Sequence, residues 1–157
     1  MATYYTDLSR SYGPRIGQGS SHDVVAATAI VQVTTAMIDA TNDAINMLWV
    51  PKGAVLLRAT IASTDIDTNG TPTIAFNVGD TGSATRIFSA ANVGQAGTLV
   101  SAINPGAFLY KFTADTLITA AVSTAAATAA AGTLYLSLEY YVDPELVSTG
   151  FAASTVA

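Results

Sequence analysis

The chain has 157 residues, of which 50% are hydrophobic and 11% are charged, and it carries a formal net charge of -5. This length fits one domain with a sizeable core. The absence of cysteine excludes disulfides, thiol catalysis and zinc–thiolate or iron–sulfur centres. Six lysines and arginines spread along the chain cannot form a dense basic patch, so we expect no nucleic acid partner.

The charged fraction is less than half of the roughly 25% that is typical of soluble domains. Surfaces of this kind are common where partner proteins cover much of a molecule. No stretch approaches 18 strongly apolar residues, and the first ten residues lack the apolar core of a signal peptide. We therefore expect no secretory signal and no membrane partner.

Residues 1–22 predict an extended N-terminal arm, because they are rich in Ser, Gly and Thr and show neither a helical nor a strand period. Ordering such a segment costs at least about 1 kcal/mol per residue, so we expect it either to be mobile or to be held by a partner. Tyrosine and arginine are the residue types that anchor interfaces. The candidates here are Tyr4, Tyr5, Arg10, Tyr12 and Arg15.

Residues 23–143 predict a β-sandwich domain, because short alternating runs are separated by Gly, Pro, Asn and Asp. The clearest run is 132–143, with one face predicted to lie in the core. The predicted core faces of the three clearest strands are Leu134, Leu136, Leu138, Tyr140 and Val142; Val55, Leu57, Ala59 and Ile61; and Ile74, Phe76 and Val78.

Weaker runs at 27–35, 45–50, 107–112 and 115–123 also predict strands, and 83–91 predicts a short helix with Ile87 and Phe88 as its buried side. Asn69-Gly70 predicts a tight hairpin turn. Seven or eight strands at this spacing indicate an all-β fold, an antiparallel sandwich or jelly roll. Residues 144–157 predict a C-terminal tail.

No constellation of catalytic residues stands out. His22 is the single histidine and lies in the predicted arm, where nothing positions it as a general base. The aspartates lie mostly in turn contexts, no pair of carboxylates is marked for glycoside hydrolysis, and the glycine-rich phosphate and nucleophile motifs are missing. We expect no enzyme, no catalytic residue and no cofactor.

One sequence match points to a metal. Asp65-x-Asp67-x-Asn69-Gly70 reproduces the opening of a calcium loop. However, position twelve of that loop, normally glutamate, is Phe76, and a hairpin turn explains the same residues. We assign no metal site here, and calcium binding by this loop stays an open alternative.

Two tyrosines are predicted on the outer face of the last strand, Tyr135 and Tyr141, whereas Tyr140 points inward. They have two interpretations: a contact with another subunit, or a stacking platform for a sugar or a single-stranded nucleic acid. Contact with a subunit is favoured, because surface tyrosines on a sandwich more often fill such a contact, and the low basic content disfavours nucleic acid.

Several segments in this order resemble the small β-sandwich virion proteins of tailed bacteriophages, of which several are capsid decoration, or cement, proteins. They follow a polar arm and are Leu48-Trp49-Val50-Pro51-Lys52-Gly53-Ala54-Val55, the strand at 73–78, the loop Gly79-Asp80-Thr81-Gly82-Ser83 leading to 86–91, and the closing strand at 132–143. The resemblance covers residues 45–143 and brings no active site with it.

The resemblance implies a structural protein that is made in the bacterial host cytoplasm and lies on the outer surface of the capsid. It implies two partners: the major capsid protein, whose neighbouring subunits it bridges, and further copies of the chain, a trimer being preferred to a dimer. The residues expected to bind partners are Tyr4, Tyr5, Arg10, Tyr12, Arg15, Tyr135 and Tyr141. A tail or head-fibre component, or a receptor- or glycan-binding sandwich, remains the alternative.

Overall fold

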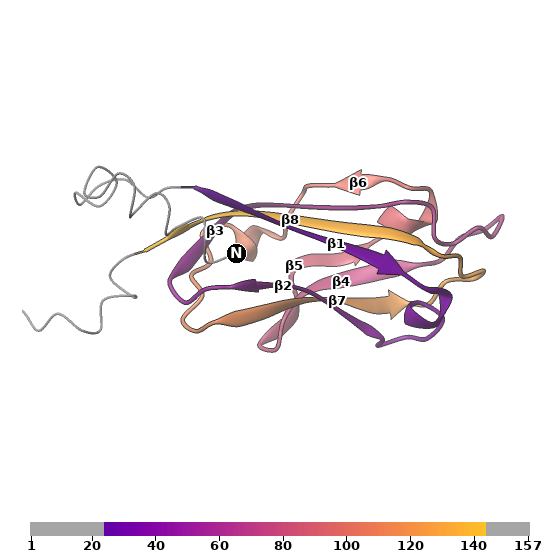
Figure 1. Cartoon of the computed structure of the whole chain (residues 1–157), viewed down its shortest axis with the longest axis horizontal. Helices are drawn as coiled ribbons and strands as arrows, with labels where there is room; N and C mark the ends of the chain where they lie inside the picture. The colour runs from indigo at the N-terminus through magenta and orange to yellow at the C-terminus, as the bar shows by residue number, and fades with distance from the viewer. Residues whose placement is uncertain (1–23, 144–157) are drawn as a thin grey trace, which may run out of the picture.

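The computed structural model describes residues 24–143, which form two antiparallel four-stranded sheets packed face to face (Figure 1). The predicted all-β sandwich is confirmed. Sheet A has the order β1 (Val25–Val33), β8 (Gly132–Val142), β3 (Ala54–Ser63), β6 (Leu99–Val100), and sheet B has β2 (Ala44–Val50), β7 (Thr116–Thr124), β4 (Ala75–Asp80), β5 (Ser83–Ala91). Three 3-10 turns lie between them, at Thr35–Met37, Val93–Gln95 and Pro105–Ala107.

The core lies between the inner faces of the two sheets. Leu134, Leu136 and Leu138 of β8 are fully buried and face Phe76 and Val78 of β4, which are also fully buried. Burying each such side chain contributes about 1.5–3 kcal/mol. The predicted core residues of these two strands are buried, except Val142 at the end of β8, which is only partly buried.

The alternation predicted for β3 is correct only in its second half. A bulge between Leu56 and Arg58 leaves Leu57 without a partner on β8. One extra residue reverses the faces, so Leu56 is fully buried and Leu57 is not. Ala59 and Ile61 point into the core as predicted.

The helix predicted at 83–91 is wrong, because these residues form strand β5. Ile87 and Phe88 are buried as expected, but as strand neighbours beside β4. Two register shifts in this ladder make adjacent burial possible, and Ala90, with φ 51, donates its N–H to Asn77 Oδ1 at 2.9 Å. Pairing with β4 overrides the local helical preference of this Ala- and Ser-containing run.

Two further local predictions are wrong. Residues 107–112 form no strand: after the 3-10 turn, Lys111 makes an isolated bridge to Val55. Asn69-Gly70 is not a hairpin turn, because β3 and β4 belong to different sheets. The residues of the described range with positive φ are Asn42, Gly53, Ala90, Gly97 and Leu109.

The described chain begins and ends at the same end of the sandwich. Val25, at the start of β1, pairs with Tyr140, near the end of β8. In Figure 1 the first part of β1 and the last part of β8 lie side by side at the left. We call this the terminal end, and the opposite end the loop end. The predicted arm residues and the tail at 144–157 lie outside the described residues.

Candidate functional site

Four large apolar side chains are exposed at the terminal end, each by more than half of its surface. Val24 precedes β1, and Trp49 lies near the end of β2, next to the turn that leads into β3. Phe108 and Leu109 follow the 3-10 turn at Pro105–Ala107. Exposed apolar groups that gather on one part of a molecule mark interaction sites.

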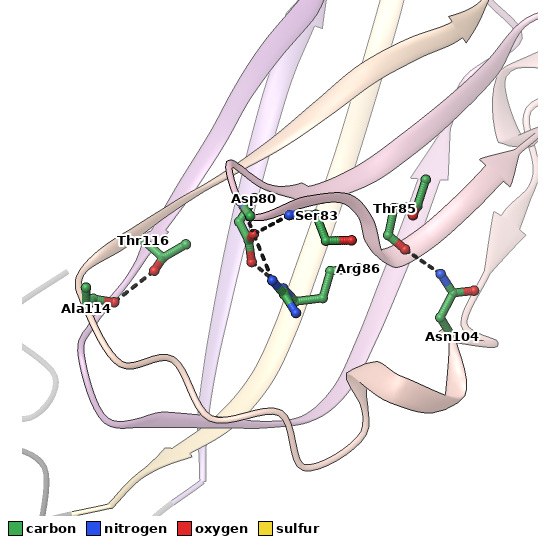
Figure 2. A network of polar contacts seen from close by, with 8 residues as sticks. Asp80, Ser83, Thr85, Arg86, Asn104, Ala114 and Thr116 are labelled. Carbon is green, nitrogen blue, oxygen red and sulfur yellow. Dashed lines mark hydrogen bonds and ion pairs between the residues drawn. The ribbon is translucent and has the colours of Figure 1, made fainter.

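The segment that carries Phe108 and Leu109 is fixed to both sheets by its backbone. Leu109 N donates to Leu56 O at 2.8 Å, and Leu56 N donates to Tyr110 O at 2.9 Å, which ties the segment to β3. Asn104 N donates to Ile87 O of β5 at 2.9 Å, and the Asn104 side chain donates to Thr85 O (Figure 2). The two exposed side chains therefore project from an ordered support.

A carboxylate and a guanidinium close the β4–β5 turn at this end. The Asp80 carboxylate accepts hydrogen bonds from Ser83 N at 2.9 Å, from Arg86 Nη2 at 3.1 Å and from Arg86 Nε (Figure 2). It also accepts one from Gly82 N at 2.8 Å. Arg86 also lies over the ring of Tyr110, 3.8 Å from its centroid. This cation–π contact joins β5 to the segment held by β3.

The charge state of this pair follows from its contacts. Burial on its own would raise the pKa of the Asp80 carboxyl, but the hydrogen bonds from Arg86, Ser83 and Gly82 outweigh it and hold the pKa below its ordinary value. The hydrogen bond to Asp80 in turn raises the pKa of Arg86. Both groups are therefore charged at neutral pH.

The last described residue is also tied down. Asp143 N donates to Gly53 O at 2.8 Å, and the Asp143 carboxylate accepts from Lys111 Nζ at 2.7 Å. Lys52 N, in the same turn as Gly53, donates to Asp115 Oδ1 at 2.8 Å. The terminal end is a braced surface with apolar side chains on its outside.

At the loop end, Asp67 holds two loops together. The residue is 1% exposed, and its carboxylate accepts hydrogen bonds from Thr73 N at 2.6 Å, Ile74 N at 3.0 Å, Ala127 N at 3.0 Å and Thr128 N at 2.8 Å. Burial would raise its pKa, but these four bonds lower it more, so the pKa lies well below its ordinary value.

This geometry does not favour calcium binding by the loop at residues 65–70. The oxygens of Asp67 face backbone N–H donors, which cannot give way to a cation, while Asp65 is exposed and Asn69 Oδ1 accepts from Thr71 N at 2.9 Å. Within residues 24–143 no three acidic, histidine or cysteine side chains converge on a possible metal. No helix in that range is long and apolar enough to cross a membrane.

The two predicted tyrosines of β8 lie on the outer face of sheet A. Tyr135 is exposed, and Tyr141 is half-buried opposite Val55 of β3. Five of the predicted partner-binding residues, Tyr4, Tyr5, Arg10, Tyr12 and Arg15, lie outside the described residues. Trp49, Phe108 and Leu109 were not predicted as interaction residues, because their only signal in the sequence is a bulky apolar residue near a Pro-Gly or Pro-Lys-Gly turn.

Solved structures similar to this chain come from bacteriophage capsids. A chain of the cyanophage Pam1 capsid asymmetric unit matches with TM-score 0.70 and 41% identity, over 80% of this chain and 89% of that one. A chain of the capsid of Ralstonia phage GP4 matches with TM-score 0.67 and 28% identity, over 80% and 88%. A chain of the acidic stable capsid of Helicobacter pylori bacteriophage KHP30, at TM-score 0.56 and 15% identity over 77% and 90%, shares the fold.

No protein-family model matches the chain, and no curated protein sequence does. The sandwich and the two more similar capsid chains define the class: this is a structural protein of a phage virion. At 41% identity over most of both chains, it belongs to the same family as the matching component of the cyanophage Pam1 capsid.

Proposed function

We propose that this protein is a capsid decoration protein without enzymatic activity. It binds the outer surface of a phage capsid and bridges neighbouring subunits of the major capsid protein. The observation that carries the proposal is the terminal end, where exposed Val24, Trp49, Phe108 and Leu109 accompany the points at which residues 1–23 and 144–157 join the sandwich. Kinship with capsid components supports the virion as its location.

The proposed mechanism is mechanical. The predicted arm, residues 1–22, lies on the capsid with Tyr4, Tyr5, Arg10, Tyr12 and Arg15 as anchors, and the terminal end of the domain at 23–143 rests beside it. The tail at 144–157 joins the sandwich at the same place. Aromatic and arginine side chains supply most of the energy of such contacts, because they bury large areas at a modest entropic cost. Copies of the chain associate on the capsid, with a trimer preferred to a dimer.

The braced support of the terminal end favours this use. A contact surface whose backbone is already fixed loses little conformational entropy on binding. The Asp80–Arg86–Tyr110 contacts and the backbone bonds of Leu109 supply that order before any partner arrives.

The first experiment is co-sedimentation of the protein with virus-sized particles and a count of copies relative to the major capsid protein. We expect a ratio of order one, or one copy per local symmetry axis. A handful of copies per particle would identify a tail or fibre component instead, and complete absence from particles would overturn a virion role.

The second experiment locates the attachment. Removing residues 1–22 should leave the circular dichroism spectrum of the sandwich unchanged and abolish binding to capsids that lack the protein. In the full chain, Trp49→Lys with Phe108→Lys should weaken binding at least tenfold. Thr68→Lys with Ser89→Lys, which adds the same two charges at exposed positions near the loop end, is the matched control and should bind normally. Unchanged binding by the truncated chain contradicts the role of the arm.

A further inference from the structure

A row of exposed apolar side chains crosses the whole outer face of sheet A. Ile30 of β1 pairs with Tyr135 of β8, Tyr135 pairs with Ala62 of β3, and Ala62 pairs with Leu99 of β6. Directly paired residues point to the same face of a sheet, so these four side chains lie in one line about 14 Å long. We call it the sheet A row.

Three of the four members of the row are large and exposed, and the fourth, Ala62, is small and half-buried. Ile30 is 63% exposed, Leu99 62% and Tyr135 38%. Their sequence neighbours Leu134, Leu136 and Ile61 are fully buried, which places the row on the outside of the sandwich. The described residues have seven exposed large apolar side chains: three lie in this row, and the other four lie at the terminal end.

The rest of the face carries little charge and few free polar groups. Thr28 Oγ1 donates to Ser137 Oγ at 3.1 Å, and Thr133 Oγ1 donates to Gln32 Oε1 at 3.3 Å. These hydroxyl groups already have partners within the sheet, so covering them leaves few donors unsatisfied. Burying this face against a partner therefore has a low desolvation cost.

The charges of the face complement a second copy of the same face. The strands of sheet A contain two charged residues, Arg58 and Glu139, and these lie directly opposite each other on β3 and β8. The face is thus neutral, in a chain whose net charge is -5. A strongly acidic or basic partner gains no net attraction from it, whereas another copy can place its Glu139 near Arg58 and its Arg58 near Glu139. Reciprocal pairing of this kind relates two copies by a two-fold axis, so this face predicts a dimer in place of the trimer preferred above.

We propose that the outer face of sheet A is the interface between copies of this chain, with Ile30, Tyr135 and Leu99 buried at its centre. Sheets packed face to face lie about 10 Å apart, which side chains of this size fill. The row lies five residues, about 17 Å, along β1 from Val25. Self-association through this face therefore leaves the terminal end free for the capsid.

The inference rests on the proposed function in one respect: it names the surface by which copies on a capsid contact each other. Its test needs no capsid. The full chain is purified and its mass in solution is measured by sedimentation equilibrium at increasing concentration. We expect an oligomer, and expect the double variant Ile30→Lys with Leu99→Lys to sediment as a single chain with an unchanged circular dichroism spectrum.

The matched control is Trp49→Lys with Phe108→Lys, which adds the same two charges at exposed apolar positions of the terminal end and should keep the wild-type mass. A monomeric wild-type chain, a row variant of wild-type mass, or a control that dissociates equally would each overturn the proposal. Lysine is well tolerated on exposed strand positions at a sheet edge, such as those of β1 and β6.

A second pair of variants keeps the test decisive if the row variant does not fold. Arg58→Glu places two like charges opposite each other and should weaken self-association at least tenfold, and adding Glu139→Arg should restore it. Equal association by all three chains would overturn the proposed complementarity. A monomer that still binds capsids defeats this inference alone, and an oligomer that never binds capsids defeats the proposed function alone.

Discussion

The two ends of the sandwich are each held by a buried aspartate, but with different partners. At the loop end, Asp67 accepts hydrogen bonds from four backbone N–H groups of two loops, Thr73 and Ile74 in one and Ala127 and Thr128 in the other. At the terminal end, Asp80 shares its carboxylate between two backbone N–H groups and Arg86, which also stacks on Tyr110.

The difference shows how the stabilising contacts are distributed at each end. At the loop end four backbone donors converge on one carboxylate, so a single substitution removes all four of these hydrogen bonds. At the terminal end the stabilisation is divided between the two backbone donors to Asp80, the Asp80–Arg86 pair and the contact of Arg86 with Tyr110. Substitutions at the two aspartate sites should therefore differ in cost.

The largest effect is expected from Asp67→Ala. It leaves four buried N–H donors without an acceptor, and each costs about 1–3 kcal/mol, with incomplete additivity. We expect a loss of at least about 4 kcal/mol in the free energy of unfolding measured with urea, which is close to the whole stability of many domains. Asp65→Ala, an exposed neighbour, is the control and should change it by under about 0.5 kcal/mol.

Should Asp67→Ala not fold, Asp67→Asn gives the measurable value. Asparagine keeps one acceptor oxygen, so we expect an intermediate loss, and a thermal midpoint below that of the wild type. A loss under about 1 kcal/mol for the alanine variant would show that the loops at this end are held in some other way.

The second effect is on acid stability. The carboxyl pKa values of Asp67 and Asp80 lie below their ordinary value of 3.8 in the folded protein. Their contribution to stability is therefore complete above about pH 4 and is lost as the pH falls through the folded-state pKa values. We expect a nearly constant unfolding free energy between pH 7 and 5 and a steep decline below about pH 4. The Asp67→Asn variant should decline less steeply; an identical slope would contradict the assignment.

The smallest effect is expected at the terminal end, from Arg86→Ala. This variant removes the cation–π contact and leaves Asp80 with its two backbone donors, at a cost of about 2 kcal/mol. Urea denaturation measures it, with Asp39→Ala, an exposed charged residue outside both proposed interfaces, as the control expected within about 0.5 kcal/mol of the wild type. A cost equal to that of Asp67→Ala would remove the contrast between the ends.

What the sequence predicted and what it did not can be traced to strand regularity. The faces of β8 were predicted because its alternation is unbroken, and Tyr135 and Tyr140 fall on opposite sides as expected. A single bulge at Leu57 reversed part of β3, and register shifts in the β4–β5 ladder produced adjacent buried residues that imitate a helical face. Bulges depend on the partner strand, which local pattern does not contain.

The interaction surfaces also depend on which strands are neighbours, and this cannot be predicted from local sequence patterns. Tyr135 was a candidate from its face alone, but the sheet A row requires knowledge that β1, β8, β3 and the two-residue β6 are neighbours in that order. The role of Asp67 was missed because two of its donors, Ala127 and Thr128, are distant in sequence. Its acidic spacing suggested a metal, whereas its true partners are main-chain groups.

The pairing of Val25 with Tyr140 has a mechanical consequence for a protein attached at its terminal end. A force that separates residues 24 and 143 acts on the β1–β8 ladder at its first pair and opens the nine pairs one after another, like a zipper. A force that pulls both residues in the same direction does not separate the two strands, so it opens none of these pairs. The fold therefore resists being lifted from a surface far better than it resists being spread along one.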